Sequence, residues 1–150
     1  GILSFLTQCL YIGLFLYAFL VVYLYFNQNK MIYIPEVEGV CSRKIELNPQ
    51  GFQSPREYGL EHEVLEIKTE DQLKLYGWLV YKNKSTLPSA PTIVYFQENA
   101  GNIGMRLNII NILVTRLSVN VVIVGYRGYG PSEGIPTETG IKLDGEAIMK

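Results

Sequence analysis

The sequence contains little cysteine, little histidine and no excess of charge of either sign. Its two cysteines and one histidine are too few for a disulfide framework or a cysteine-rich zinc site, so we expect neither a metal nor another cofactor. Lys and Arg number 13 against 14 Asp and Glu, which gives a net charge of −1. Proteins that bind nucleic acid normally carry a basic excess or stripe, so this composition indicates no nucleic-acid partner.

Charge is absent from the N-terminal part of the chain. No charged residue precedes Lys30, and residues 2–26 form one apolar run. As a helix this run would extend about 37 Å, enough to cross the roughly 30 Å hydrocarbon core of a bilayer. Tyr23, Tyr25 and Phe26 close the run, as an interfacial aromatic belt would. A cleaved signal peptide would have a shorter apolar region with a basic flank before it. We therefore predict a single-pass transmembrane anchor over 2–26, in the plasma membrane or an endomembrane, with its orientation open.

The remaining residues indicate one globular domain behind a linker. Segment 27–61 is rich in proline and glycine and shows neither a helical period nor a convincing strand. We interpret it as a linker that keeps the domain, expected over 62–150, close to the membrane surface. Apolar and polar residues alternate over 64–68 and again over 73–81, separated by a turn at 70–72. This alternation predicts an antiparallel hairpin at the start of the domain.

A strand–helix–strand unit is predicted after the hairpin. Segments 92–96 and 119–124 are apolar on both faces, which is typical of strands in a covered parallel sheet. Between them, apolar residues spaced three and four apart over 103–117 predict an amphipathic helix. Thr137 is expected to cap a final helix. Two buried-type strands would leave an unprotected sheet edge, so we expect residues 62–150 to be the first part of a larger α/β domain.

Two loops, 97–104 and 126–134, follow the carboxyl ends of these strands, where open α/β sheets place their ligand sites. The first is rich in Gly and Asn and precedes a helix, so its backbone N–H groups point toward any anion placed there. From the residues alone, three interpretations stay open: an oxyanion hole, a phosphate or nucleotide site, and a tight β–α connection. The phosphate interpretation lacks both glycine-rich phosphate motifs, and Glu98 would repel a phosphate.

The two loop motifs together resemble the membrane-anchored α/β-hydrolases, and more narrowly the Bem46-like group of that family. The motifs are Phe96-Gln97-Glu98-Asn99-Ala100-Gly101-Asn102-Ile103 and Tyr126-Arg127-Gly128-Tyr129-Gly130, followed by Ser132, Gly134, Pro136, Gly140 and Asp144. The resemblance covers nearly the whole chain and implies the N-terminal half of an α/β-hydrolase sheet, an antiparallel hairpin followed by a βαβ unit. It implies a membrane-anchored serine hydrolase that cleaves an ester, thioester or amide through an acyl-enzyme. The bilayer is then a partner, and a small acyl or lipid-like molecule a plausible substrate.

The resemblance also implies site residues. In this superfamily an amide of the loop after the third strand completes the oxyanion hole, and by motif position that amide belongs to Asn99, with Gln97 and Ala100 beside it. The loop commonly begins His-Gly, for which Gln97-Glu98 stands here, so the resemblance provides no histidine side chain at this position. The supporting loop is expected to include three residues after the second buried strand: Tyr126, Arg127 and Gly128.

No residue of the catalytic triad is expected within this sequence. Ser132 matches G-x-S-x-G in spelling, but it lies several residues after the strand end and no helix starts at it, unlike the serine of a nucleophile elbow. His62 precedes the first predicted strand, whereas the catalytic histidine comes last in chain order in this fold. Arg127 is expected to brace the two loops rather than bind substrate, and Asp144 to contact Arg127 or the loop backbone.

Two further classes stay open. A hydrolase-like chain without activity could be a membrane protein or a subunit of a complex, and the coding sequence past residue 150 discriminates this class from the enzyme. The other class is a nucleotide-binding membrane protein, which phosphate would stabilise against heat.

Overall fold

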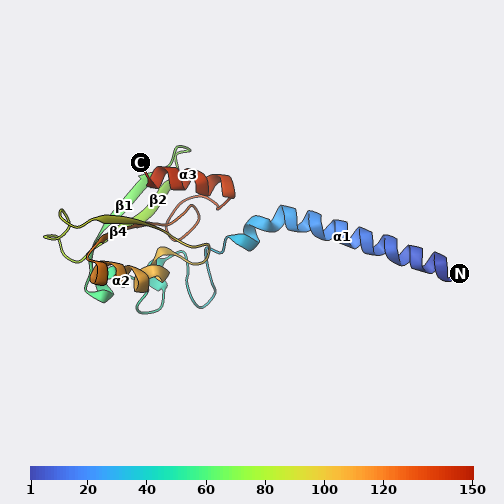
Figure 1. Ribbon diagram of the computed structural model, residues 1–150, viewed down its shortest axis with the longest axis horizontal. Helices are drawn as coiled ribbons and strands as arrows, with labels where there is room; N and C mark the ends of the chain where they lie inside the picture. Colours follow the sequence, from blue (N-terminus) through green and yellow to red (C-terminus); the bar gives the residue numbers. More distant parts are fainter. The chain divides into compact units, whose positions relative to one another are not determined.

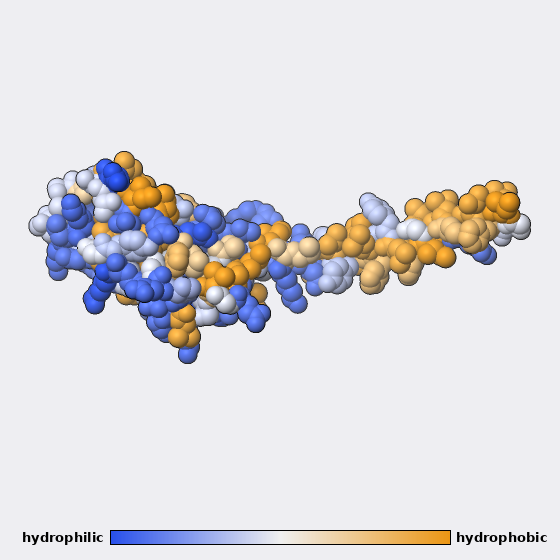
Figure 2. All heavy atoms as spheres, turned by 90° about the horizontal axis from the view of Figure 1, so that it is seen from below, coloured by the Kyte–Doolittle hydropathy of each residue, from blue (hydrophilic) through white to orange (hydrophobic).

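A computed structural model describes residues 1–150 and divides them into two units, Gly1–Ile32 and Tyr33–Lys150. The first unit is one helix, α1 (Ile2–Ile32), with no buried residue (Figure 1). Hydrophobic atoms cover much of its surface in Figure 2, and by length and composition it could span a membrane. The helix continues past residue 26, where side-chain amides bond carbonyls of the preceding turn: Asn27 to Tyr23 at 2.9 Å and Gln28 to Tyr25 at 3.0 Å.

The second unit is built on a mixed four-stranded sheet in the order β1-β2-β4-β3. β1 (Glu61–Lys68) and β2 (Lys74–Tyr81) form the antiparallel hairpin that the alternation predicts. β4 (Asn120–Val124) pairs antiparallel with β2 on one side and parallel with β3 (Thr92–Phe96) on the other. The expected hairpin and βαβ unit are therefore confirmed.

Helices cover both faces of this sheet (Figure 1). α2 (Leu107–Leu117) follows a 3-10 turn, Ile103–Arg106, and its buried side chains belong to the same core cluster as residues of β2 and β4. α3 (Glu138–Ile148) lies on the other face. Thr137 caps α3 as the sequence predicts, because its side chain accepts a hydrogen bond from the N–H of Gly140 at 3.1 Å.

Residues 33–60 differ from the linker interpretation of 27–61, because they pack into the second unit. Ile45 and Leu60 are buried and join the core cluster that contains Trp78 of β2. The segment includes two 3-10 turns, Ile45–Leu47 and Pro55–Tyr58. Single apolar side chains make these contacts without any period, so the composition of the segment does not reveal them.

The two parallel strands differ in how their backbones are paired. β4 lies between β2 and β3, so both of its sides are hydrogen-bonded, whereas β3 pairs with β4 alone and forms one edge of the sheet. The exposed edge expected from the sequence is therefore present at β3 and absent at β4.

Candidate functional site

The two loops singled out in the sequence start at the same end of the sheet. β3 and β4 are parallel neighbours, and their last residues, Phe96 and Val124, lie opposite each other in register. Beyond them, the hydroxyl of Tyr129 donates a hydrogen bond of 2.7 Å to the carbonyl oxygen of Asn99. Burial raises the pKa of Tyr129 to about 12, so this hydroxyl stays protonated and remains a donor at neutral pH. The structure thus joins the two loops at one place.

The peptide between Asn99 and Ala100 is fixed from one side. Its carbonyl oxygen, on Asn99, accepts from Tyr129 and also from the N–H of Ile34 at 2.9 Å. The carbonyl of Ile34 in turn accepts from the N–H of Gly101 at 2.9 Å, so Ile34 brackets Ala100. In a trans peptide the N–H points opposite to the carbonyl, so the N–H of Ala100 faces away from these partners. It has no hydrogen-bond partner of its own.

The two residues that stand where the family has His-Gly lie in different environments. Gln97 is buried, and both polar atoms of its side chain lack a hydrogen-bond partner. Glu98 is exposed and its carboxylate pairs with Arg106 at 2.9 Å. The guanidinium of Arg106 also donates to the carbonyl oxygen of Ala100. The positive charge of Arg106 therefore compensates the negative charge of Glu98.

A buried pair of side-chain amides, Asn48 and Asn102, holds the same loop in place. Asn102 is fully buried, and its side-chain Oδ1 accepts from the N–H of Gly104 at 3.0 Å and from Nδ2 of Asn48 at 2.8 Å. Its Nδ2 donates to the carbonyl of Ser42 at 2.7 Å. The sequence motif contains Asn102 but gives no sign of Asn48, which lies 54 positions away in a segment without periodicity.

Ser132 occupies a structural position in the second loop. It is fully buried, and its hydroxyl donates to the carbonyl of Gly125 at 2.7 Å and accepts from the N–H of Tyr76 at 2.9 Å. Arg43 fixes the backbone beside it by donating to the carbonyls of Gly130 and Ser132, at 3.2 and 2.7 Å. No sequence signal marks Arg43, because its partners are carbonyl groups.

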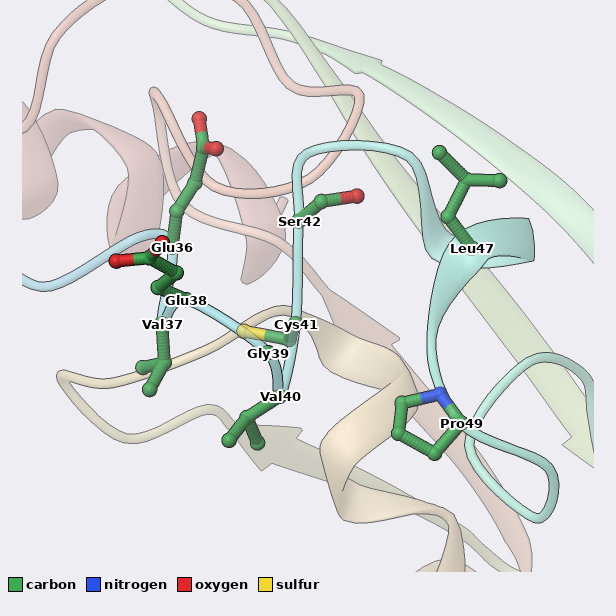
Figure 3. A pocket seen from close by; sticks show the side chains of 9 residues that line it. All are labelled: Glu36, Val37, Glu38, Gly39, Val40, Cys41, Ser42, Leu47 and Pro49. Atoms are coloured by element: carbon green, nitrogen blue, oxygen red, sulfur yellow. The ribbon is translucent and has the colours of Figure 1, made fainter.

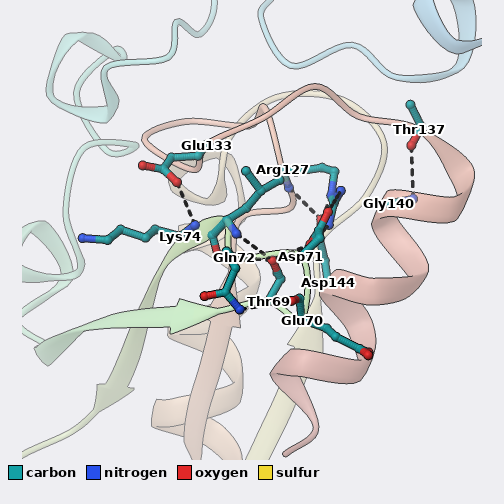
Figure 4. A network of polar contacts seen from close by, with 11 residues as sticks. Thr69, Glu70, Asp71, Gln72, Lys74, Arg127, Glu133, Thr137, Gly140 and Asp144 are labelled. Atoms are coloured by element: carbon teal, nitrogen blue, oxygen red, sulfur yellow. Dashed lines mark hydrogen bonds and ion pairs between the residues drawn. The ribbon is translucent and has the colours of Figure 1, made fainter.

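Arg127 lies between two carboxylates (Figure 4). Its Nη1 and Nη2 donate to Asp71 at 2.8 and 3.0 Å. Its backbone N–H and Nε donate to Asp144 at 2.8 and 2.9 Å, and Nη2 lies 2.8 Å from the same carboxylate. The expected contact of Asp144 with Arg127 is therefore present. The bracing differs from the expectation, because Arg127 ties its loop to the β1–β2 turn and to α3 rather than to the loop after β3.

The neighbours of Arg127 have their own constraints. Gly128 has a φ of +81°, and a Cβ there would lie 2.6 Å from the ring of Pro136, so only glycine fits. Burial and the negative charge of Asp144 raise the pKa of Tyr126. Tyr126 is therefore neutral at physiological pH and can only donate or accept a hydrogen bond.

The single histidine lies apart from both loops. His62 is on β1, within rather than before the first strand, and β1 is the sheet edge opposite to β3. Its ring packs edge-on against Trp78, with 5.7 Å between the centroids. Burial, and then the charge of Arg56, lower the pKa of His62, so the ring is neutral at physiological pH.

The pair between Arg127 and Asp71 is expected to weaken in acid. Hydrogen bonds from Arg127 and Thr69 lower the pKa of Asp71 from 3.8 to about 2. Because the folded-state pKa is below the unfolded value, the stabilisation is complete above the unfolded pKa and is lost as the pH falls toward the folded one. Urea unfolding followed by Trp78 fluorescence, from about pH 5 to about pH 2, measures this loss. The Asp71→Asn variant should show a smaller loss over that window, and identical curves for the two proteins would contradict the assignment.

The chain is similar in sequence to several eukaryotic proteins, although no protein-family model matches it. It is 40% identical over 106 residues to the protein Bem46 of Schizosaccharomyces pombe, which covers 68% of this chain and 35% of that protein. It is 35% identical to the alpha/beta hydrolase domain-containing protein WAV2 of Arabidopsis thaliana, over 81% of this chain and 37% of that protein. It is 34% identical to the uncharacterized membrane protein YNL320W of Saccharomyces cerevisiae, over 84% of this chain and 40% of that protein. The chain thus spans well under half the length of these relatives.

The structure is similar to those of an esterase, Pf2001 of Pyrococcus furiosus. One crystal form of that esterase gives a TM-score of 0.54 at 22% identity, covering 79% of this chain and 39% of that one. A second form gives a TM-score of 0.53 at 24% identity, covering 77% and 40%. At this identity the similarity shows a shared fold.

Proposed function

This chain belongs to the α/β-hydrolase fold family, in the Bem46-like group, and we propose from this membership that it carries the oxyanion-hole loop of a membrane-anchored serine hydrolase. In the proposed reaction a serine attacks the carbonyl carbon of an ester, thioester or amide, and the carbonyl oxygen becomes an oxyanion. The acyl-enzyme forms when the oxyanion collapses and the alcohol, thiol or amine leaves with a proton. Water then releases the acid. Residues 1–150 contribute stabilisation of the oxyanion rather than the nucleophile.

The observation that carries this proposal is the fixed peptide between Asn99 and Ala100. An oxyanion hole needs N–H donors held in place before charge develops, because donors that must reorient during the reaction lose much of their effect. Ile34 and Tyr129 both bond the Asn99 carbonyl, which holds the peptide plane and leaves the Ala100 N–H directed away from them. We assign Ala100 as a donor beside the Asn99 N–H that the family resemblance implies.

The charges around the loop are compatible with this role. A free carboxylate near a developing oxyanion would oppose it, but Glu98 forms an ion pair with Arg106. Gln97 contributes a neutral carboxamide in place of the family's histidine. The tie between Arg127, Asp71 and Asp144 holds the supporting loop that presents Tyr129 to Asn99.

Membrane anchoring by α1 is part of the same proposal. The helix is long and apolar enough to span a bilayer, and one relative is called a membrane protein. An anchored hydrolase meets molecules that partition into the bilayer at high local concentration. A small acyl or lipid-like substrate is therefore the class we propose.

A non-catalytic member of the family is the second candidate. It is favoured by the position of Ser132, the serine that matches G-x-S-x-G in spelling, which is buried with its hydroxyl bonded on both sides. The single histidine lies on the far edge strand β1. In this alternative the two glycine-rich loops have a structural role and no catalytic one.

A fluorophosphonate probe, which labels activated serines covalently, separates the two candidates. Applied to the chain of residues 1–150, it should label nothing. Applied to the protein as its source cells make it, it should label one serine other than Ser132, and heat denaturation should abolish the labelling. Mass spectrometry of the labelled peptide identifies the position. No labelling of the native protein would support the non-catalytic candidate, and labelling at Ser132 would refute the structural role assigned to it.

A further inference from the structure

The connection between β2 and β3 contains a sequence motif that the candidate site does not use. Asn83-Lys84-Ser85 matches N-x-[ST], the acceptor motif for N-linked glycans, and its middle residue is not proline. No other asparagine of the 150 residues is followed two positions later by serine or threonine. A short motif of this kind also occurs by chance, so its structural surroundings decide whether it can be used.

The motif lies on the surface, at the end of the sheet opposite to the candidate site. Residues 82–91 connect β2 to β3. Because β2 runs antiparallel to β4, this connection lies at the end where β3 and β4 begin, whereas the two loops of the candidate site follow the end where they finish. Lys84 and Ser85 are exposed, and Asn83 is half-buried. A bulky group attached to Asn83 would therefore leave the candidate site open.

The two polar atoms of the Asn83 carboxamide have different environments. Its Oδ1 accepts from the hydroxyl of Ser85 at 2.6 Å and from the N–H of Thr86 at 3.1 Å. A backbone N–H can only donate, so the atom that Thr86 contacts is the oxygen. Nδ2 has no hydrogen-bond partner, and it is not among the buried polar atoms that lack one. The nitrogen to which a glycan would be attached is therefore free and in contact with solvent.

The N-terminal helix provides a second, independent observation. N-linked glycans are attached in the lumen of the secretory membranes, and a chain must be targeted there. α1 is long and apolar and lies near the N-terminus, a form shared by membrane anchors and signal sequences. Cys41 is compatible with an oxidising lumen, because its free thiol is buried and no second cysteine is among the side chains beside it in Figure 3.

We propose that Asn83 carries an N-linked glycan and that residues 33–150 lie on the lumenal or extracellular side of the membrane. The donor is a lipid-linked oligosaccharide, and a glycosyltransferase of the cell catalyses the transfer. A bond forms between Nδ2 and C1 of the first sugar, the bond from C1 to the lipid diphosphate breaks, and the diphosphate leaves as the amide loses one proton. Oδ1 is unchanged, so its hydrogen bonds to Ser85 and Thr86 persist. The proposal is independent of the acyl-transfer chemistry.

The first test uses the protein as its source cells make it. Cleavage after Glu70 and Glu98 releases residues 71–98, in which Asn83 is the only asparagine. A peptide N-glycosidase acting in heavy-oxygen water should convert Asn83 to aspartate that carries the heavy isotope, which mass spectrometry detects in this peptide. Without the glycosidase, the peptide should be found with an attached oligosaccharide. An unmodified Asn83 in the untreated protein would overturn the proposal.

Variants made in the same cells test the motif. Asn83→Gln and Ser85→Ala should each abolish the modification of peptide 71–98, whereas Ser85→Thr should retain it, because threonine also fits the motif. Asn111→Gln is the matched control, since Asn111 lies outside any such motif, and it should leave the modification unchanged. A glycan that persists at Asn83 in the Ser85→Ala variant would contradict the proposal.

A protease-protection experiment tests the side of the membrane. In sealed vesicles prepared from the endoplasmic reticulum, residues 71–98 should resist a protease added outside and become degradable once detergent opens the vesicles. The Asn83→Gln variant should be protected equally, because the side of the membrane does not depend on the glycan. Degradation in intact vesicles would place this part of the chain in the cytosol and refute the inference.

Discussion

Replacing Asp144 by alanine is expected to lower the free energy of unfolding of residues 33–150 by about 3–5 kcal/mol, as is found when one partner of a buried ion pair is removed. Asp144 is fully buried and accepts hydrogen bonds from the backbone N–H and from the guanidinium of Arg127. Without it, the Arg127 side chain, which is 7% exposed, keeps its charge but loses the partner on its inner side. Trp78 is the single tryptophan and is buried, so its fluorescence reports unfolding in urea.

Two further variants make this experiment specific. Asp71→Ala should cost less than Asp144→Ala, because the Asp71 side chain is 39% exposed and water replaces part of what it provides. The double variant Arg127→Met/Asp144→Leu should recover part of the loss, since a buried ion pair replaced by apolar residues leaves no uncompensated charge. Equal and small losses for Asp71→Ala and Asp144→Ala would show that the buried pair is not the main contributor.

Replacing Asn102 by alanine is expected to cost about 2–4 kcal/mol, the sum of a lost helix N-cap and of buried polar groups left unpaired. Its Oδ1 caps the turn at Gly104, and its carboxamide pairs with that of Asn48. Alanine would leave the Asn48 side chain and the Ser42 carbonyl without this partner. Asn48→Ala should therefore produce a loss of similar size, and the two losses should not add, because both variants remove the same pair.

Asn111→Ala is the matched control. Asn111 lies on α2 with a side chain that forms no hydrogen bond, and alanine is the better helix former, so stability should change by less than about 0.5 kcal/mol. The comparison is made by urea unfolding with Trp78 as reporter. A loss of under 1 kcal/mol for Asn102→Ala, at the level of an exposed substitution, would contradict the role of the buried pair.

The regular part of the fold could be predicted because its residues repeat. Alternation marks β1 and β2, two-sided apolar runs mark β3 and β4, and spacing of three and four marks α2. Segment 33–60 has no such repeat. Its burial depends on Ile45 and Leu60 as single side chains, and nothing local in the sequence distinguishes them from exposed residues.

The candidate site could be predicted in part for a similar reason. Parallel strands end at one edge of a sheet, so the meeting of the two loops follows from strand direction alone. The contact of Arg127 with Asp144 was also predictable, because Asp144 belongs to the residues that carry the family resemblance and lies on the helix that follows the Arg127 loop. The contact of Asp71 with Arg127 could not be predicted, because the two residues are 56 positions apart. The contact of Ile34 with the loop could not be predicted either, because backbone groups make it and no side chain is involved.

The two backbone hydrogen bonds that Ile34 forms on either side of Ala100 determine where a truncated version of this protein should begin. A soluble version designed from composition would begin near residue 62, at the end of the proline- and glycine-rich stretch. Such a truncation would remove Ile34, Arg43 and Asn48 together, and with them the backbone and side-chain supports of both loops. A version that begins at Tyr33 discards the apolar helix and retains every one of these supports.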